Sequence, residues 1–309
     1  MAPNLAPTTT IREIRTPLTE LLDIQVPICL APMSTGGGAD LAAQVTKCGG
    51  FAFIPAGDDT VDVLKKEVQA FKDIINPPPS QQVPVGVGFL AWHLEAGHED
   101  LLACALDLNV KAVCFAFGDH MDRWVKFVQG QDHASGRRTI IFVMVHSAEH
   151  AAAVAKLRVD VVIAQGIEAG GIMTGSHIAA LLTAGAHGCL LGTRFVMARE
   201  SYYTPSQRDA MLLAKSNSAT ERTLAFDEMF MGSIFLETTT EYNAGEPLAE
   251  LRAKYRKAAE EGDADRIATW AGLGVVLLKE IQESAENIMR ELTEECFARL
   301  KAVGAIVDH

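Results

Sequence analysis

Short runs of β-branched and apolar residues alternate with longer segments of helical periodicity through the first two thirds of the chain. In Asp59–Phe71 and Ala148–Leu157, apolar residues recur on one helical face. Strands that alternate with helices at a repeat of about 30 residues indicate parallel βαβ units. The runs that predict strands are Val26–Leu30, Gly50–Ile54, Val83–Phe89, Val110–Phe117, Thr139–Val145, Val159–Ala164 and Gly188–Phe195.

Glycines recur just past the ends of these predicted strands. They stand at Gly36–Gly38, Gly57, Gly118, Gly170–Gly171 and Gly192. A (β/α)₈ barrel builds its active-site loops at this edge, so the pattern predicts an α/β fold of the (β/α)₈ barrel type. A doubly wound Rossmann sheet would need GxGxxG after the first strand and an acidic residue about 20 positions later, and STGGGADLA lacks that spacing.

The alternation of predicted strands and helices ends at Phe195. Ser216–Glu221 is typical of a loop and precedes an apolar stretch, Met229–Leu236. Helices are expected over Leu248–Ala259 and Leu273–Leu300, on either side of a break at Gly262–Asp263. We therefore divide the chain into a barrel core, residues 1–200, and a mixed lid and helical C-terminal region, residues 201–309, that packs on it. Positions of the last helix expected to face the barrel or a small capping subdomain are Ile281, Ala285, Ile288, Leu292, Cys296 and Leu300.

Composition narrows the class of protein. With 27 Lys and Arg against 39 Asp and Glu, the net charge of −12 argues against a nucleic-acid partner or a polybasic membrane anchor. The six cysteines are widely spaced, show no zinc-binding spacing, and are expected to be buried thiols, so no metal site is predicted. No apolar window reaches the length of a membrane span, and we expect a cytoplasmic protein.

Three segments carry the candidate chemistry: Pro27–Gly57, which contains APM, Val159–Gly171, which contains AQGIEAGG, and Ile178–Ser201, which contains LGTRF. Trp270–Met289 is a weaker fourth. In this order they resemble the nitronate monooxygenase family, historically called 2-nitropropane dioxygenases. The resemblance implies a (β/α)₈ barrel that binds FMN in its core, residues 1–200, and oxidises a nitronate or a similar carbon acid with O₂.

Each motif also has a physical interpretation. After the first strand, a backbone held rigid by proline can approach a flavin ring, and a methionine can pack on it. The resemblance places the Gln165 amide on the flavin, while neighbouring glycines permit close backbone approach. Gly192 and Thr193 offer a bare N–H and a hydroxyl, which suit a phosphate. The cofactor-binding candidates are Ala31, Pro32, Met33, Gln165, Gly170, Gly171, Gly192 and Thr193. The alternatives are a core strand that ends in a turn and ordinary glycine loops, with Arg194 in a surface ion pair.

The chain departs from the family pattern after EAGG. The family typically has a histidine there, whereas this chain has Ile172. The 22 residues of Gly166–His187 hold one crossover helix but not two crossovers and a strand. We therefore expect seven evident strands and one absent βα unit. The barrel would then be incomplete or irregularly closed, a downstream piece such as Gly232–Thr240 would replace the strand, or the sequence would be a shortened variant.

A base is needed to remove the α-carbon proton of a neutral nitroalkane. His120 and His146 directly follow apolar runs and should point into the barrel mouth, so they are the catalytic candidates. His93 is a weaker candidate, and His177, at a helix start, is expected to be structural.

Two other functions stay open. One is an NAD(P)H-dependent flavin reductase of an enoyl or quinone substrate, and the other is a catalytically degenerate barrel that binds flavin without turnover. A small-molecule substrate and O₂ are the expected partners. An exposed barrel flank left by the absent unit would favour a homo-oligomer.

Overall fold

The computed structural model describes residues 12–57, 59–166, 170–214, 241, 244–261, 269–278 and 284–307. Its strands are β1 (Ile28–Leu30), β2 (Phe51–Pro55), β3 (Val83–Leu90), β4 (Val110–Ala116), β5 (Ile140–Val145), β6 (Val161–Ala164) and β7 (Cys189–Leu191). Its helices are α1 (Pro17–Leu22), α2 (Ala39–Lys47), α3 (Val61–Ile75), α4 (Ala91–Glu95), α5 (Glu99–Asp107), α6 (Met121–Ser135), α7 (Ala148–Ala155), α8 (Gly175–Thr183), α9 (Pro205–Leu213), α12 (Leu248–Glu261) and α13 (Ala285–Val307), with 3₁₀ turns η1 (Phe195–Met197) and η3 (Leu273–Leu277).

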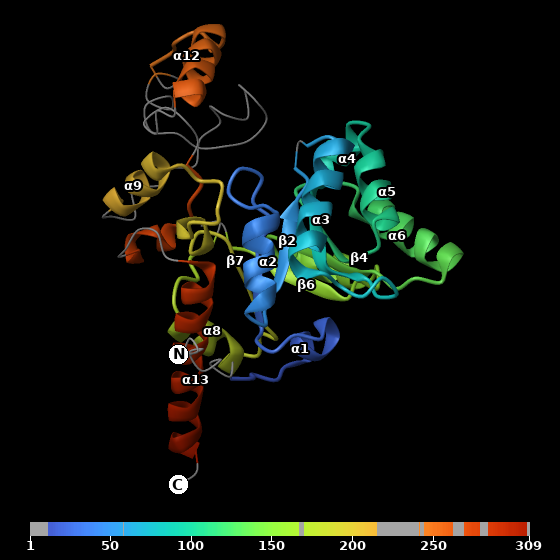
Figure 1. Ribbon diagram of the computed structural model, residues 1–309, viewed down its shortest axis with the longest axis vertical. Coiled ribbons are helices and arrows are strands. Elements are labelled where there is room, and N and C mark those ends of the chain that lie inside the picture. Colours follow the sequence, from blue (N-terminus) through green and yellow to red (C-terminus); the bar gives the residue numbers. More distant parts are fainter. Residues whose placement is uncertain are drawn as a thin grey trace, which may run out of the picture.

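The seven strands form one parallel sheet in the order β6-β5-β4-β3-β2-β1-β7. The last described strand, β7, therefore pairs with the first, β1, as it would in a barrel, and helices surround the curved sheet (Figure 1). Within the described residues, β6 and β7 are the two edges of the sheet. This confirms the predicted barrel-type α/β fold with seven evident strands. The interpretation that a βα unit is absent stays a prediction.

Alternating side chains divide the core into two layers. The barrel interior holds Phe51, Phe53 and Phe142, whose rings meet edge to face at centroid distances of 5.3 and 5.1 Å. Leu18 and Leu22 of α1 join this cluster at the amino-terminal end of the strands. Side chains of opposite register, such as those of Val113 and Val143, pack instead in the larger cluster between strands and helices.

The C-terminal helix packs against α8 and α2 (Figure 1). Its Ala285, Ile288, Leu292 and Cys296 are buried, which confirms the predicted face; Leu300 is half-buried. The single helix expected over Leu273–Leu300 is wrong, however: residues 273–277 form η3, and α13 begins at residue 285. The Ser284 hydroxyl accepts a hydrogen bond from the Asn287 N–H, a cap that favours a helix start at this point.

Other expected elements differ in length or lie outside the described residues. The run Gly188–Phe195 yields only three strand residues before η1, because β7 has one neighbour, β1, among the described strands. Leu248–Ala259 is helical and continues to Glu261. Outside the described residues lie Ser216–Glu221, Met229–Leu236, Gly232–Thr240, Gly262–Asp263 and Ile281.

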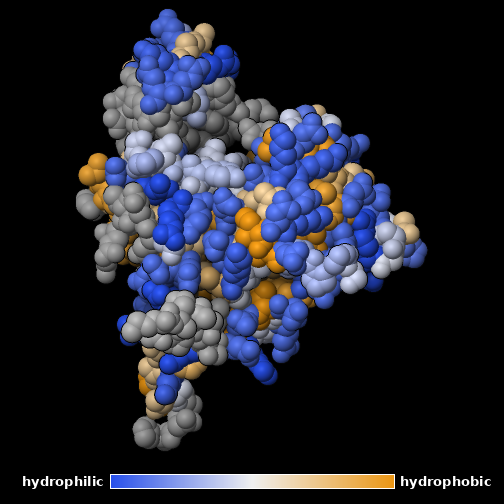
Figure 2. Space-filling view, viewed as in Figure 1, coloured by the Kyte–Doolittle hydropathy of each residue, from blue (hydrophilic) through white to orange (hydrophobic). Residues whose placement is uncertain are grey.

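Five of the six cysteines are buried and Cys48 is half-buried, which agrees with the expected buried thiols. Burial raises the pKa of the Cys114 thiol to about 12, so it stays protonated at neutral pH. The face in Figure 2 is mostly hydrophilic, and apolar side chains show between the barrel elements. In the described part of the chain, no helix combines the length and apolar character needed to cross a membrane.

Candidate active site

The carboxyl ends of β1 and β7 bring two of the predicted motifs together. The Ala31 N–H donates to the Leu191 carbonyl at 2.9 Å. A Cβ atom placed on Gly192 would lie 3.2 Å from Met33 Sδ and 3.8 Å from Ala31 Cβ. APM and LGT are therefore neighbours at the mouth of the barrel.

Strand register decides which of these residues face the barrel axis. Cys29 and Leu190 belong to the interior cluster, so Ala31 and Gly192, two positions further along their strands, lie on the same inward side. Neither has a side chain larger than a methyl group. Pro32 packs over Gly88 of β3, where a Cβ atom would overlap its ring.

One of the two predicted bases, His146, and the predicted amide, Gln165, follow the neighbouring strands β5 and β6. Phe142 of β5 and Ile163 of β6 belong to the interior cluster, and alternation carries the inward side to His146 and Gln165. Met144 pairs with Ile163, and the Gln165 N–H donates to the Val145 carbonyl at 3.0 Å, so the ladder continues past the strands. His146 and Gln165 are thus adjacent at neighbouring strand ends.

The 3₁₀ turn η3 connects Thr193 to the segment of Gly170 and Gly171. Thr193 Oγ1 accepts a hydrogen bond from the Gly272 N–H at 2.9 Å. Gly171 lies against Gly274: a Cβ atom on Gly171, whose φ is +147°, would sit 3.8 Å from the Gly274 nitrogen. Gly170 has a φ of +114° and open space around its missing side chain. Sequence reasoning gave no role to Gly272 and Gly274, although both lie in the weaker fourth segment.

The remaining sequence candidates make contacts with other residues. His120 precedes α6, is exposed, and donates its backbone N–H to Glu95 Oε1 at 3.0 Å. His177 Nδ1 accepts from the Met173 N–H at 3.3 Å, as expected of a structural residue. Arg194 forms the expected ion pair, with Glu291 at 2.6 Å. The arginine itself is buried, and only the glutamate is exposed.

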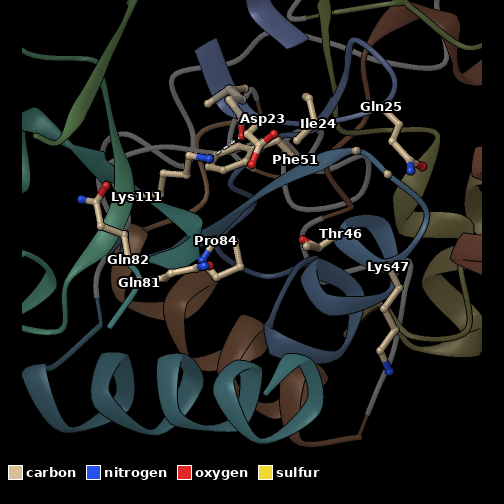
Figure 3. Close-up of a pocket in the computed structure, with 13 residues that line it drawn as sticks. Asp23, Ile24, Gln25, Thr46, Lys47, Phe51, Gln81, Gln82, Pro84 and Lys111 are labelled. Atoms are coloured by element: carbon tan, nitrogen blue, oxygen red, sulfur yellow. Dashed lines mark hydrogen bonds between the residues drawn. The ribbon is translucent and has the colours of Figure 1, made fainter. Parts of the chain in front are cut away.

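A cavity of about 490 Å³ opens at the other end of the barrel, beside α1 and the amino ends of β2, β3 and β4 (Figure 3). Lys111 reaches its edge and donates to the Leu22 carbonyl at 2.5 Å, and burial lowers the pKa of this lysine. Lys47 points away from the cavity (Figure 3). Since barrel enzymes act at the carboxyl ends of their strands, this cavity is not the candidate site.

Comparisons with known proteins agree with this geometry. The model of the nitronate monooxygenase family matches residues 15–174 and 167–295, two stretches that share residues 167–174. A nitronate monooxygenase of Neurospora crassa is 27% identical over 348 aligned positions, which cover 90% of this chain and 91% of that protein. A probable nitronate monooxygenase of Staphylococcus aureus is 26% identical, with 82% and 90% covered.

Two solved structures share the fold. FabK from Thermotoga maritima has a TM-score of 0.79 at 23% identity and covers 95% of this chain and 100% of its own. Nitroalkane oxidase from Streptomyces ansochromogenes has a TM-score of 0.74 at 25% identity, with 93% and 99% covered.

The family implies a flavin, and the mouth of this barrel suits one. Small inward residues at positions 31 and 192 leave the backbone of β1 and β7 accessible, and Gly170 has open space around it. Gln165 and Thr193 supply polar groups from other parts of the rim. In the described part of the chain, no group of three or more His, Cys, Asp or Glu residues could hold a metal ion. The family match covers most of the chain, and we conclude that the chain belongs to the nitronate monooxygenase family and is a flavin-dependent oxidoreductase.

Proposed function

We propose that the chain binds FMN at the barrel mouth and oxidises small nitroalkanes or their nitronates with O₂. Gly192 and Thr193 would hold the phosphate. Ala31, Pro32 and Met33 would lie along the flavin ring, with the Gln165 amide donating a hydrogen bond to it. Gly170 and Gly171 would let the backbone approach closely. The flavin, when bound, is the group that accepts electrons from the substrate.

We further propose that His146 removes the α-proton when the substrate is a neutral nitroalkane. The observation that carries this assignment is its position: it continues the inward register of β5, beside Gln165. Imidazole exchanges protons near neutral pH, and this side chain is exposed at the mouth, so the proton can pass on to water. Ile172, at the position of the family's histidine, packs against the core and has no proton to exchange. His120 is the second candidate, since it follows the neighbouring strand.

Steady-state rates of His146→Ala and His120→Ala with neutral nitroethane and with its preformed nitronate test this assignment. Loss of a general base lowers the rate by about 10²- to 10⁴-fold, and the preformed nitronate needs no such base. We expect His146→Ala to show this loss with nitroethane and a far smaller one with the nitronate, while the flavin content stays unchanged. Wild-type rates in both variants and in the double variant would exclude both residues as the base.

A parallel assay addresses the reductase alternative. Anaerobic addition of NADH should leave the visible flavin absorption largely intact, whereas a nitronate should bleach it. Bleaching by NADH alone would favour the reductase, and a protein without bound flavin would favour the degenerate barrel.

A further inference from the structure

The turn after β4 holds an aromatic residue in an unfavourable backbone conformation. Phe117 has a φ of +54°, in the left-handed region that bulky side chains rarely adopt. Asp23, Asn76, Asn109 and Arg158 share this sign of φ; aspartate and asparagine are residue types that tolerate it better, so Phe117 and Arg158 are the two unfavourable cases. Strain of this kind persists only where the surrounding structure enforces it, and it is frequent at functional sites.

Contacts from α4 enforce the strained turn. The Trp92 N–H donates to the Phe117 carbonyl at 3.0 Å. Gly118 sits so close to Ala91 that a Cβ atom would lie 2.5 Å from the alanine methyl group. The Glu95 carboxylate accepts the His120 N–H at 3.0 Å, which fixes the far side of the turn.

The consequence of the strain is the direction of one ring. Had β4 continued, Phe117 would point with Phe115 into the layer between sheet and helices, where Phe115 is fully buried. The left-handed turn takes it out of that layer, and 46% of its surface is exposed. The ring instead stacks on the His146 imidazole, with a centroid distance of 5.3 Å and an interplanar angle of 18°.

We infer that Phe117 is a positioning residue whose strained turn places its ring against His146 and holds the imidazole in its catalytic orientation. This inference rests on the proposed function, because it takes His146 as the base. Burial of the Phe117 ring does not offset the strain, since the residue is nearly half exposed. What the strained conformation provides is the stacking contact with His146. An imidazole on an exposed strand end would otherwise sample several rotamers, and even a small misplacement of a catalytic group lowers the rate strongly.

The first test reads the stacking directly, without turnover. Protons that lie over an aromatic face resonate upfield, so the ring C–H signals of His146, assigned by their loss in His146→Ala, should move downfield in Phe117→Gly and Phe117→Leu. Phe117→Tyr should keep them in place. Glycine accepts a φ of +54° without cost, so Phe117→Gly preserves the turn while it removes the ring. Unmoved signals in both Phe117→Gly and Phe117→Leu would overturn the inference.

The second test is a double-mutant cycle on the rate with neutral nitroethane. Phe117→Gly should lower kcat by about tenfold to a hundredfold, with a smaller effect on KM and a smaller loss with the nitronate. Added to His146→Ala, it should cause no further loss, because its effect passes through that residue. Additive losses would overturn the inference and leave the base intact. If His146→Ala itself keeps the wild-type rate, the assignment of the base fails, whatever the stacking signals show.

Discussion

Replacement of Gly192 by aspartate should strongly weaken FMN binding while the fold survives. The nearest atoms to a new Cβ would be Met33 Sδ at 3.2 Å and Met33 Cγ at 3.7 Å, both on a flexible side chain, with Ala31 Cβ at 3.8 Å. A shift of a few tenths of an ångström in Met33 accommodates the change. The new carboxylate then stands on the inward side of the mouth, where the proposed phosphate site lies.

Charge repulsion sets the magnitude. Two unit charges about 4 Å apart in an environment with an effective dielectric constant of about 20 repel by about 4 kcal/mol. Because about 1.4 kcal/mol corresponds to a tenfold change in Kd, the aspartate should weaken FMN about a thousandfold. Titration of the apoprotein with FMN, followed by flavin fluorescence, measures the Kd.

Two comparisons separate charge from bulk. Gly192→Asn has nearly the same shape without the charge and should weaken FMN far less than Gly192→Asp. Riboflavin has no phosphate, so the aspartate should affect its binding about as little as the asparagine does. If aspartate and asparagine weaken FMN equally, or if riboflavin suffers the same loss as FMN, the phosphate does not lie beside residue 192.

Three further predictions concern stability. Gly175→Ala should lower the free energy of unfolding by about 1–3 kcal/mol in urea titrations, because the new Cβ would lie 2.5 Å from the Cys296 nitrogen of α13. Gly304→Ala, in open space on α13, should instead raise the free energy of unfolding by about 0.5–1 kcal/mol. Burial tends to raise the pKa of Glu295, but hydrogen bonds from the Ser176 hydroxyl and the Gly175 N–H outweigh it and lower that pKa. The stability that ionised Glu295 gives the fold is therefore fully present above its unfolded pKa of about 4.3 and is lost as the pH falls through the lower pKa of the folded state. Glu295→Gln should therefore make the melting temperature fall less steeply at acid pH, and an equally steep fall would contradict this. Tyr203→Phe should lower the free energy of unfolding by about 1 kcal/mol or more, because the Tyr203 hydroxyl accepts a hydrogen bond from the backbone nitrogen of residue 270 at 2.7 Å and donates one to its carbonyl at 3.0 Å. An unchanged free energy of unfolding in urea titrations would show that these two hydrogen bonds do not stabilise the fold.

The strands were predictable because burial on both faces leaves a continuous apolar run in the sequence. Every predicted run contains a strand, and their order along the chain follows the barrel order of the sheet. The ends were less predictable. The predicted strand Gly188–Phe195 extends past β7 into η1, where Phe195 is buried although it belongs to a 3₁₀ turn. The helical periodicity of Leu273–Leu300 is continuous, yet Gly274 packs against Gly171 and Met173 within the 3₁₀ turn η3, and α13 begins only at residue 285.

Some members of the candidate site were accessible from the sequence, and others required the fold. His146 and Ala31 were proposed as mouth residues because each directly follows a predicted strand, whereas Gln165 was proposed from the family resemblance and Gly192 from its place near the end of the last predicted strand. Phe117 was predicted as the last residue of its strand, and only the backbone dihedral shows that its ring turns toward the neighbouring strand. The signal available beforehand was Gly118, which permits the close approach to α4.

Anaerobic mixing of the purified, flavin-loaded protein with propane-2-nitronate shows whether the bound flavin oxidises a nitronate. We expect the visible absorption of the bound flavin to bleach on a single addition and to return when air is admitted, with FMN as the cofactor released on denaturation. A bound flavin that stays oxidised in the presence of excess nitronate would contradict it.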